Sequence, residues 1–201
     1  MLEYFNHRFF QALAAPPDLA GAVLIAATLL AQSAILGGPA LLLFIWIVGK
    51  TNERRAAVSA GLSCALALAV AGAISSLYFH PRPFTDGLAP DRFAHAADSS
   101  FPSDHATLLF ALAFSLLLAR PPATPRAGLV AMALALAVAW SRVFLGVHYP
   151  LDVAGAALIG LVAAACFASV AGQRLASALT KFGERIYVRL LSAFLSRGPS
   201  R

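Results

Sequence analysis

Charged residues are scarce in this chain of 201 residues: Asp, Glu, Lys and Arg make up 12% of it, whereas hydrophobic residues make up 60%. A soluble domain carries about 25% charged and about 45–50% apolar residues. This composition, with a mean hydropathy of +0.77, therefore predicts an integral membrane protein. The alternating ten-residue strands of an outer-membrane barrel are also lacking. We expect an all-α polytopic bundle of about five to six transmembrane helices, forming a single integral-membrane domain over residues 1–201.

Cysteine is rarer still, with two residues in the chain. Cys64 and Cys166 both sit inside apolar runs without the spacing of metal ligands, and we interpret them as small buried or lipid-facing residues. The N-terminus also lacks a basic flank and apolar run ending in a small-residue cleavage site, so no cleavable signal peptide is expected. The net charge of +6 is compatible with nucleic-acid binding, but most basic residues flank apolar runs as membrane anchors do. We therefore expect no nucleic-acid partner.

Long apolar runs divide the chain into five predicted spans, at residues 19–48, 57–79, about 105–119, 127–146 and 150–171. As a helix the first run would measure about 45 Å, more than the hydrocarbon core of about 30 Å. Gly37-Gly38-Pro39 is expected to kink or break it. Because each half is too short to cross alone, we interpret this run as one long, broken span. A short polar loop at Lys50–Arg55 and a long loop at residues 80–103 are also expected.

Two amphipathic segments flank these spans. Residues 2–14, which precede Pro16-Pro17, predict an interfacial helix with an aromatic face. Residues 173–196 repeat apolar side chains at helical spacing, with basic side chains largely on the other side. Such a helix lies on an anionic membrane surface, so membrane lipids are expected partners.

The distribution of basic residues predicts the orientation. If the loop at 50–55 lies inside, the loop at 120–126 and the C-terminal tail lie inside as well. These segments hold eleven of the fifteen Lys and Arg residues, namely Lys50, Arg54, Arg55, Arg120, Arg126, Arg174, Lys181, Arg185, Arg189, Arg197 and Arg201. Cytoplasmic loops carry such an excess. We therefore expect a multi-pass protein of the bacterial inner membrane. The three polar clusters described next would then lie on the extracytoplasmic face.

Three polar clusters interrupt the edges of the apolar runs, where charged groups usually carry function. The first is Pro81-Arg82-Pro83, in which the prolines hold a guanidinium suited to phosphate oxygens, although a lone Arg there also suits headgroup anchoring. The second is Pro102-Ser103-Asp104-His105. Its Ser or Asp can cap the following helix and leave an anion site at the first turn, with His105 as a proton donor; the alternative is a simple cap beside an incidental His.

The third cluster is Ser141-Arg142, followed by His148 and Asp152. Pro150 suits the first turn of the next helix, which would place His148 and Asp152 on one face. A carboxylate bonded to one imidazole nitrogen leaves the other free to attack. Together the three clusters indicate a phosphate pocket with a nucleophile and a proton donor.

These motifs resemble the three-part signature of the type 2 phosphatidic acid phosphatase superfamily. Residues 78–84, 100–105 and 146–150 are most similar to its bacterial undecaprenyl-diphosphatase branch, and the motif-bearing core covers residues 78–156. The resemblance implies a metal-free and cofactor-free enzyme that takes a polyprenyl diphosphate lipid on the outer face of the inner membrane. It also implies a part in peptidoglycan synthesis and bacitracin resistance.

The resemblance assigns roles to the residues. His148 would attack the terminal phosphorus to form a phosphohistidine, Asp152 would orient His148, and His105 would protonate the leaving lipid phosphate. Oxygens of the phosphate would be held by Arg82, Ser103, Asp104 and Arg142. The superfamily's usual Lys is replaced by Ser75 and its usual Gly by Asp104. His80, Arg92 or His95 are possible auxiliary cations.

Three alternatives to undecaprenyl-diphosphate hydrolysis stay open at this point. The substrate can be another lipid phosphate, such as phosphatidylglycerophosphate or phosphatidic acid. The phosphate can pass to a lipid acceptor instead of water. The chain can also be a lipid-phosphate carrier or permease subunit without chemistry, although such a protein has no need of His105, His148 and Asp152 in this arrangement.

Overall fold

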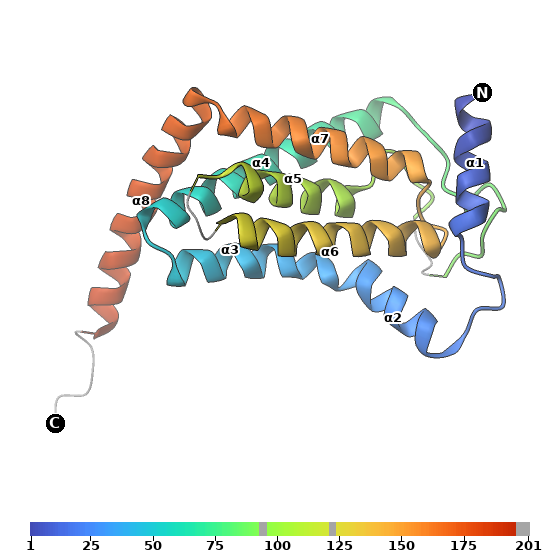
Figure 1. The fold of residues 1–201 in the computed structure, drawn as a ribbon, viewed down its shortest axis with the longest axis horizontal. Coiled ribbons are helices and arrows are strands. Elements are labelled where there is room, and N and C mark those ends of the chain that lie inside the picture. Colours follow the sequence, from blue (N-terminus) through green and yellow to red (C-terminus); the bar gives the residue numbers. More distant parts are fainter. Residues whose placement is uncertain (93–95, 121–123, 196–201) are drawn as a thin grey trace.

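The computed structural model describes residues 1–92, 96–120 and 124–195, and all regular structure in these ranges is helical. Four elements precede the first long helix: α1 (Leu2–Leu13), α2 (Gly21–Gln32), the 3-10 turn η1 (Ala34–Leu36) and α3 (Gly37–Val48). Five more follow, namely α4 (Thr51–Leu77), α5 (Asp104–Leu118), α6 (Thr124–Phe144), α7 (Pro150–Ala168) and α8 (Val170–Leu195). Figure 1 shows a bundle of lengthwise helices with α1 across one end and α8 across the other. The predicted all-α membrane bundle is confirmed.

Several described helices are suited to crossing a membrane. By length and apolar composition α4, α6 and α7 each qualify, and the bent pair of α2 with η1 and α3 can serve as a fourth span. The apolar α5 has only 15 residues, or about 22 Å, and packs against α4, α6 and α7. The protein is therefore a multi-pass membrane protein in which the short apolar helix α5 lies at the centre of the bundle.

Small residues bring these helices together. The core around α5 is rich in fully buried alanines, including Ala60, Ala111 and Ala135 from three helices. At Gly160 of α7, an added Cβ would lie 2.7 Å from the backbone nitrogen of Ala111. Small side chains allow such close approach of helices in membranes, where packing takes over from the hydrophobic effect.

The first apolar run is broken, as expected, but the break is not at the predicted residues. The two arms, Gly21–Gln32 and Ala34–Val48, meet at an angle of 40° at Ser33, while Gly37-Gly38-Pro39 form the first turn of α3. Proline is tolerated there because its missing N–H has no helical partner in a first turn. Gly38 is small because leucines of α5 lie against it; a Cβ at Gly38 would come within 3.2 Å of Leu108.

The predicted polar loop at Lys50–Arg55 is wrong for most of its length. Only Gly49 and Lys50 separate α3 from α4, and Thr51 to Arg55 form the first turn and a half of α4. Polar residues at the start of a helix can remain helical while they face the headgroups, and Glu53 there complements the helix dipole. The other predicted spans and both amphipathic helices agree with the structure to within a few residues.

Candidate active site

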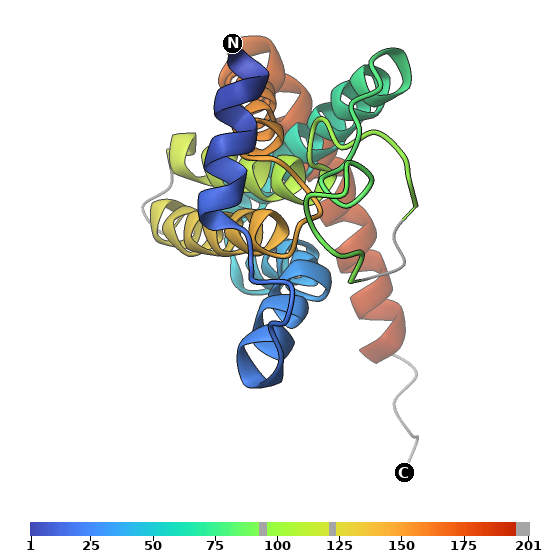
Figure 2. The ribbon, with the colours of Figure 1, turned by 90° about the vertical axis from the view of Figure 1, so that its right-hand side faces the viewer.

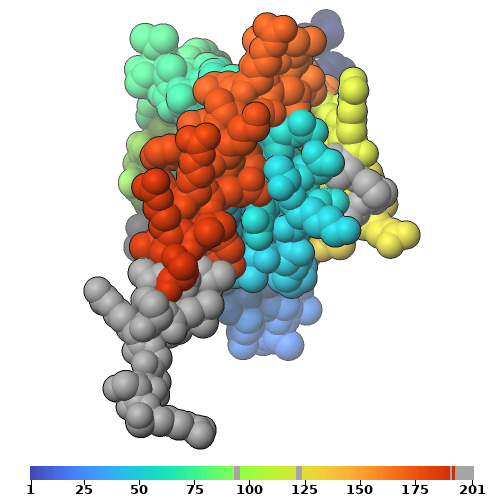
Figure 3. Space-filling view, turned by 90° about the vertical axis from the view of Figure 1, so that its left-hand side faces the viewer, coloured from blue at the N-terminus to red at the C-terminus, as the bar shows by residue number. Residues whose placement is uncertain are grey.

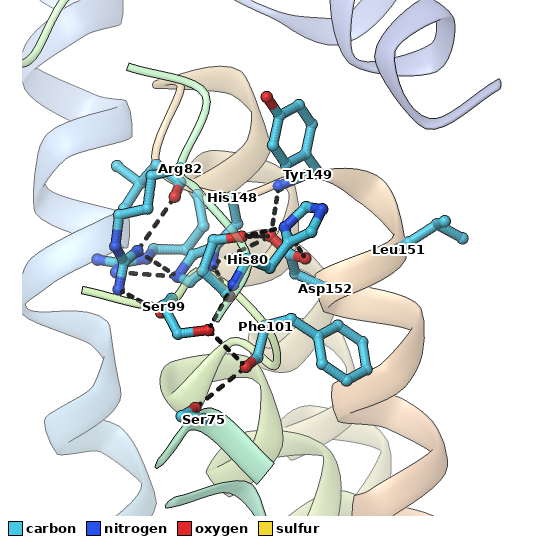
Figure 4. A network of polar contacts seen from close by, with 12 residues as sticks. Ser75, His80, Arg82, Ser99, Phe101, His148, Tyr149, Leu151 and Asp152 are labelled. Carbon is cyan, nitrogen blue, oxygen red and sulfur yellow. Dashed lines mark hydrogen bonds and ion pairs between the residues drawn. The ribbon is translucent and has the colours of Figure 1, made fainter. Parts of the chain in front are cut away.

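The three polar clusters predicted from the sequence meet at one end of the bundle. The chain passes through this end after α4, before α5 and between α6 and α7, and α1 lies across it (Figures 1 and 2). Figure 4 shows Arg82, His148 and Asp152 together in one network of polar contacts. Residues 66 positions apart in the sequence, Arg82 and His148, are hydrogen-bonded there.

A tight turn after α6 places His148 beside Arg142. The amides of Leu145, Gly146 and Val147 donate to the carbonyls of Ser141, Val143 and Arg142, each at 3.0 Å. Gly146 has φ +79°, a conformation that side chains disfavour, and a Cβ there would collide with Ala89. The turn therefore folds the chain back over the last turn of α6.

His148 is held in one tautomer. Its Nδ1 lies 2.8 Å from the carbonyl oxygen of Ser100, and the side chain is only 2% exposed. A carbonyl oxygen can only accept, so Nδ1 carries the proton and Nε2 keeps its lone pair. The carboxylate of Asp152 is a more distant neighbour, with Oδ2 3.5 Å from Nδ1.

Two buried guanidiniums face this lone pair. Nε2 of His148 lies 3.3 Å from Nη1 of Arg82 and 3.2 Å from Nη2 of Arg142. Arg82 is fixed further by Asp98, whose Oδ1 accepts from Nε at 2.9 Å, and by the carbonyl of Val147 at 3.1 Å. Two like charges converging on a neutral atom favour an anion between them, and guanidinium forks suit the oxygens of phosphate.

The start of α5 supplies a further part of an anion site. Ser103 is the N-cap residue, but its side chain makes no capping bond, and its buried hydroxyl has no hydrogen-bond partner among the described residues. A buried hydroxyl without a partner is costly unless a ligand completes it. The first-turn amides of a helix also attract anions. Asp104 lies within electrostatic range of Arg82 and Arg142, and His105, the next residue, is partly buried.

Asp152 stands behind His148 and is connected to other residues. Its Oδ2 accepts from the backbone N–H of Tyr149 at 2.7 Å, an arrangement that caps α7, and from the hydroxyl of Ser100 at 2.9 Å. Because that hydroxyl donates to Asp152, its oxygen accepts from Nδ1 of His80 at 2.8 Å. His80 also lies 3.8 Å from Asp152, between Nδ1 and Oδ1. This chain of hydrogen bonds from His80 through Ser100 to Asp152, called the relay below, lies on the side of His148 away from the arginines.

Helix α1 supports the same region from outside the bundle. The side chain of Asn6 is 2% exposed and accepts from the N–H of Leu151 at 3.1 Å, near the start of α7. The rings of His7 and Phe10 pack on Tyr149, whose hydroxyl donates to Asp86 at 2.6 Å. Tyr149 is fully buried and precedes α7, so α1 and the loop after α4 fix the residue next to His148.

The possible auxiliary cations lie in different places. Arg92 donates to the carbonyls of Pro16 and Pro17 at 2.8 and 3.4 Å, and so ties the loop to the segment before α2. His80 belongs to the relay behind Asp152, and His95 falls outside the described residues. Ser75, which stands in place of the superfamily's Lys, donates to the carbonyl of Phe101 at 3.1 Å (Figure 4).

Several residues of the site were not singled out by sequence reasoning. The Ser100 carbonyl fixes the tautomer of His148, and the Val147 carbonyl and Asp98 hold Arg82. Every residue type carries the same backbone carbonyl, so the sequence cannot show which carbonyl makes a contact. Asp98 is a single acid in a polar loop, so nothing in the sequence marks it as the partner of Arg82.

Burial sets the protonation states of His148 and Tyr149, which lie in the segment between α6 and α7. It lowers the pKa of His148 to about 4, reinforced by the charges of Arg142 and Arg82 and partly offset by Asp152. Burial and the bond to Asp86 raise the pKa of Tyr149 above its usual value. At neutral pH the site therefore holds an uncharged imidazole and an un-ionised phenol.

The sequence and the fold of this chain are similar to those of known proteins. The PAP2 superfamily model matches residues 56–175. A relative from Escherichia coli (strain K12), named "Putative undecaprenyl-diphosphatase YbjG", is 36% identical over 162 residues, which are 81% of this chain and 80% of the relative. Undecaprenyl-diphosphatase BcrC of Bacillus subtilis (strain 168) is 33% identical over 65% of this chain and 66% of its own length. The crystal structure of Aquifex aeolicus LpxE, at 22% identity, has the same fold, with a TM-score of 0.60 over 82% of this chain and 92% of LpxE.

Proposed function

The chain belongs to the PAP2 superfamily and is a membrane lipid phosphatase, and from this premise we propose that it removes the terminal phosphate of undecaprenyl diphosphate. The product would be undecaprenyl phosphate, the lipid carrier of cell-wall synthesis. Two relatives named for this activity cover most or about two thirds of the chain, which supports the substrate. The proposal includes an extracytoplasmic active site in the inner membrane, supported by the eleven basic residues in the opposite segments.

One observation carries the chemistry: Nε2 of His148 bears a lone pair and faces two guanidiniums. In the proposed first step, Nε2 attacks the terminal phosphorus and forms an N–P bond. The bond from phosphorus to the bridging oxygen breaks, its electron pair leaves on undecaprenyl phosphate, and His105 protonates that oxygen. Arg82, Arg142, Ser103 and the amides near Asp104 hold the equatorial oxygens, where charge develops.

In the second step, water attacks the phosphohistidine. The N–P bond breaks, its electrons return to Nε2, and inorganic phosphate leaves. His105, now neutral, can take the proton of the attacking water, as an acid in one step serves as base in the next. Asp152 stabilises the imidazolium character that His148 gains while phosphorylated, although the nearer Ser100 carbonyl fixes its tautomer.

The decisive experiment uses purified protein in detergent with a chelator and undecaprenyl diphosphate labelled at the terminal phosphorus. We expect labelled phosphate in the medium and, after acid-free quenching, a base-stable, acid-labile label on the wild-type protein. His148→Ala should give neither product. Unchanged phosphate release by His148→Ala would disprove the nucleophile role.

A panel of lipids tests the substrate separately. Phosphatidylglycerophosphate, phosphatidic acid and farnesyl diphosphate are compared with undecaprenyl diphosphate by kcat/KM in the same detergent. A higher kcat/KM for either glycerolipid would show that this lipid, and not undecaprenyl diphosphate, is the preferred substrate. The proposed mechanism would be unaffected. Transfer of the label to an added lipid acceptor, in place of free phosphate, would make the enzyme a phosphotransferase.

A further inference from the structure

A cavity with both polar and apolar lining lies at the end of the bundle opposite the active site. It has a volume of about 650 Å³ and is enclosed by α4, the end of α5, the end of α7 and α8. Space exists there because α5 ends at Leu118 after 15 residues, whereas α4 and α8 continue past it. Figure 3 looks onto this end, where α8, in orange and red, lies beside α4, in cyan.

Four basic side chains line the cavity, and no Asp or Glu does. These cations are Arg55 from α4, Arg120 after α5, and Arg174 and Lys181 from α8. The acid nearest to them along α8, Glu184, is engaged elsewhere, by Arg54 at 3.4 Å and Thr51 at 3.0 Å. Among the described residues none of the four cations forms an ion pair, and Arg120, Arg174 and Lys181 are exposed, so the cavity presents positive charge to an anion from outside the chain.

Polar groups and an apolar wall accompany these cations. Ser59 and Ser115 are each only 5% exposed and line the cavity together with Gln173, whose amide donates to the hydroxyl of Ser59 at 3.3 Å. Alanines such as Ala56 and Ala164 form apolar parts of the wall. The Ser59 hydroxyl accepts from this amide and keeps its own hydrogen to donate. A hydroxyl donor beside guanidiniums suits phosphate oxygens, while apolar walls suit the carbons next to them.

The position of the cavity points to a lipid source for that phosphate. On α8, Leu175, Leu179, Phe182 and Ile186 are exposed at helical spacing, as in a helix that lies in a membrane interface. The cavity on its inner side is therefore at the depth of the headgroups. Basic pockets between helices at this depth suit anionic headgroups.

We propose that this cavity is a binding site for a phosphate-bearing anion, supplied by the headgroup of an anionic phospholipid in the leaflet opposite the active site. Arg55, Arg174 and Lys181 bind the phosphate, and the acyl chains leave along the bundle. The proposal is independent of the hydrolytic reaction, because it concerns the other end of the molecule and is tested by binding.

The test compares two charge-matched triple variants of the full-length protein in detergent by native mass spectrometry. One carries Arg55→Gln, Arg174→Gln and Lys181→Gln. The control carries Arg126→Gln, Arg185→Gln and Arg189→Gln, which remove three charges outside the lining of the cavity. Each protein is titrated with phosphatidylglycerol, with phosphatidylcholine that has the same acyl chains, and with glycerol 3-phosphate.

We expect the wild type to prefer phosphatidylglycerol to phosphatidylcholine, the cavity variant to lose roughly 100-fold in affinity, and the control to stay within about twofold. Saturation by glycerol 3-phosphate alone, with the same dependence on the cavity cations, would assign the site to a soluble phosphate. Equal losses in both triple variants, or no preference for phosphatidylglycerol, would overturn the site.

Melting temperatures without lipid show whether the variants are folded. Should the triple cavity variant fail to fold, the single exposed changes Arg174→Gln and Lys181→Gln replace it. Each is expected to weaken phosphatidylglycerol binding about fivefold, against no change for Arg189→Gln. Unchanged binding in both single variants would equally contradict the proposal.

Discussion

Arg82 and Arg142 reach the same atom: one guanidinium nitrogen of each lies within 3.3 Å of Nε2 of His148. If both bind the transferred phosphoryl group, Arg82→Lys and Arg142→Lys should each lower kcat by about 10²–10³-fold, because a lysine lacks the planar fork. Steady-state phosphate release measures this loss. Arg92→Lys is the matched control, since Arg92 binds backbone carbonyls in the same loop; an equal loss there would make Arg92 a phosphate ligand.

The proposed proton donor, His105, and the proposed nucleophile, His148, can be told apart by the leaving group. His105→Ala should slow hydrolysis of a lipid diphosphate by about 10²–10⁴-fold. In the phosphorylation step, measured as the burst of released phenol, the same variant should be nearly as fast as wild type on an aryl phosphate, whose acidic phenol leaves without a proton. His148→Ala should be inactive on both substrates. Equal losses for His105→Ala in the phosphorylation step of both substrates would contradict its role as the acid.

We expect Asp152 to contribute less to kcat than the acid of a catalytic triad does. In such a triad the acid alone fixes the tautomer of the histidine. The Ser100 carbonyl already holds Nδ1–H at 2.8 Å, so Asp152→Asn keeps the tautomer and loses mainly charge. We expect a loss of about 10–10²-fold in kcat, in contrast to the roughly 10⁴-fold seen where the wrong tautomer forms. Activity assays on Asp152→Asn and Ser100→Ala, which keeps the carbonyl, decide this. A loss of about 10⁴-fold in Asp152→Asn alone would make its carboxylate the dominant support of His148.

The buried imidazole predicts a dependence of stability on pH. The native pKa of His148 is lowered to about 4, whereas an unfolded His titrates near 6.5. Between these values the unfolded chain binds a proton that the native protein does not, so this residue makes stability fall as pH falls from about 6.5 to 4. The melting temperature of His148→Asn in detergent should fall less over this range than that of wild type. Parallel curves for the two proteins would show that His148 is not buried in its neutral form.

Asp98 is expected to compete with phosphate for Arg82, because it is an anion bound to that guanidinium. Its carboxylate is 61% exposed and accepts from Nε of Arg82 at 2.9 Å. Asp98→Asn keeps an oxygen acceptor and removes the negative charge, so inorganic phosphate and vanadate should inhibit this variant at several-fold lower concentrations. Inhibition constants test this, with Asp18→Asn as a control that removes an acid elsewhere in the chain. Weaker inhibition of Asp98→Asn would show that Asp98 chiefly positions Arg82.

The sequence predicted the fold well because its signals are local. Long apolar runs set the helices of a membrane protein, and Pro150 marked the start of α7 to the residue. Polar starts such as Thr51 to Arg55 were misread as loop, since polarity alone does not separate a helix end from a turn. The displaced break in the first run was not predictable locally: Gly38 packs on α5 from within a regular helix, and no local pattern reveals that contact.

Convergence of the site was predictable for a different reason. An orientation derived from basic residues placed all three clusters at one end, and the structure joins Arg82, Arg142 and His148 there. The supporting contacts were not predictable. The Ser100 carbonyl belongs to the backbone, and the contacts of Asn6 and His7 with the start of α7 join residues more than 140 positions apart.

The docking of α1 has a practical consequence for handling the protein. Asn6, His7 and Phe10 hold the segment that precedes α7, and Glu3 reaches to within 3.4 Å of His80. A purification tag fused ahead of Met1 would crowd this contact, whereas one attached after Arg201 would follow α8 at the far end of the bundle. Preparations tagged at the two termini should therefore differ in specific activity, with the C-terminal fusion the better reagent for kinetics.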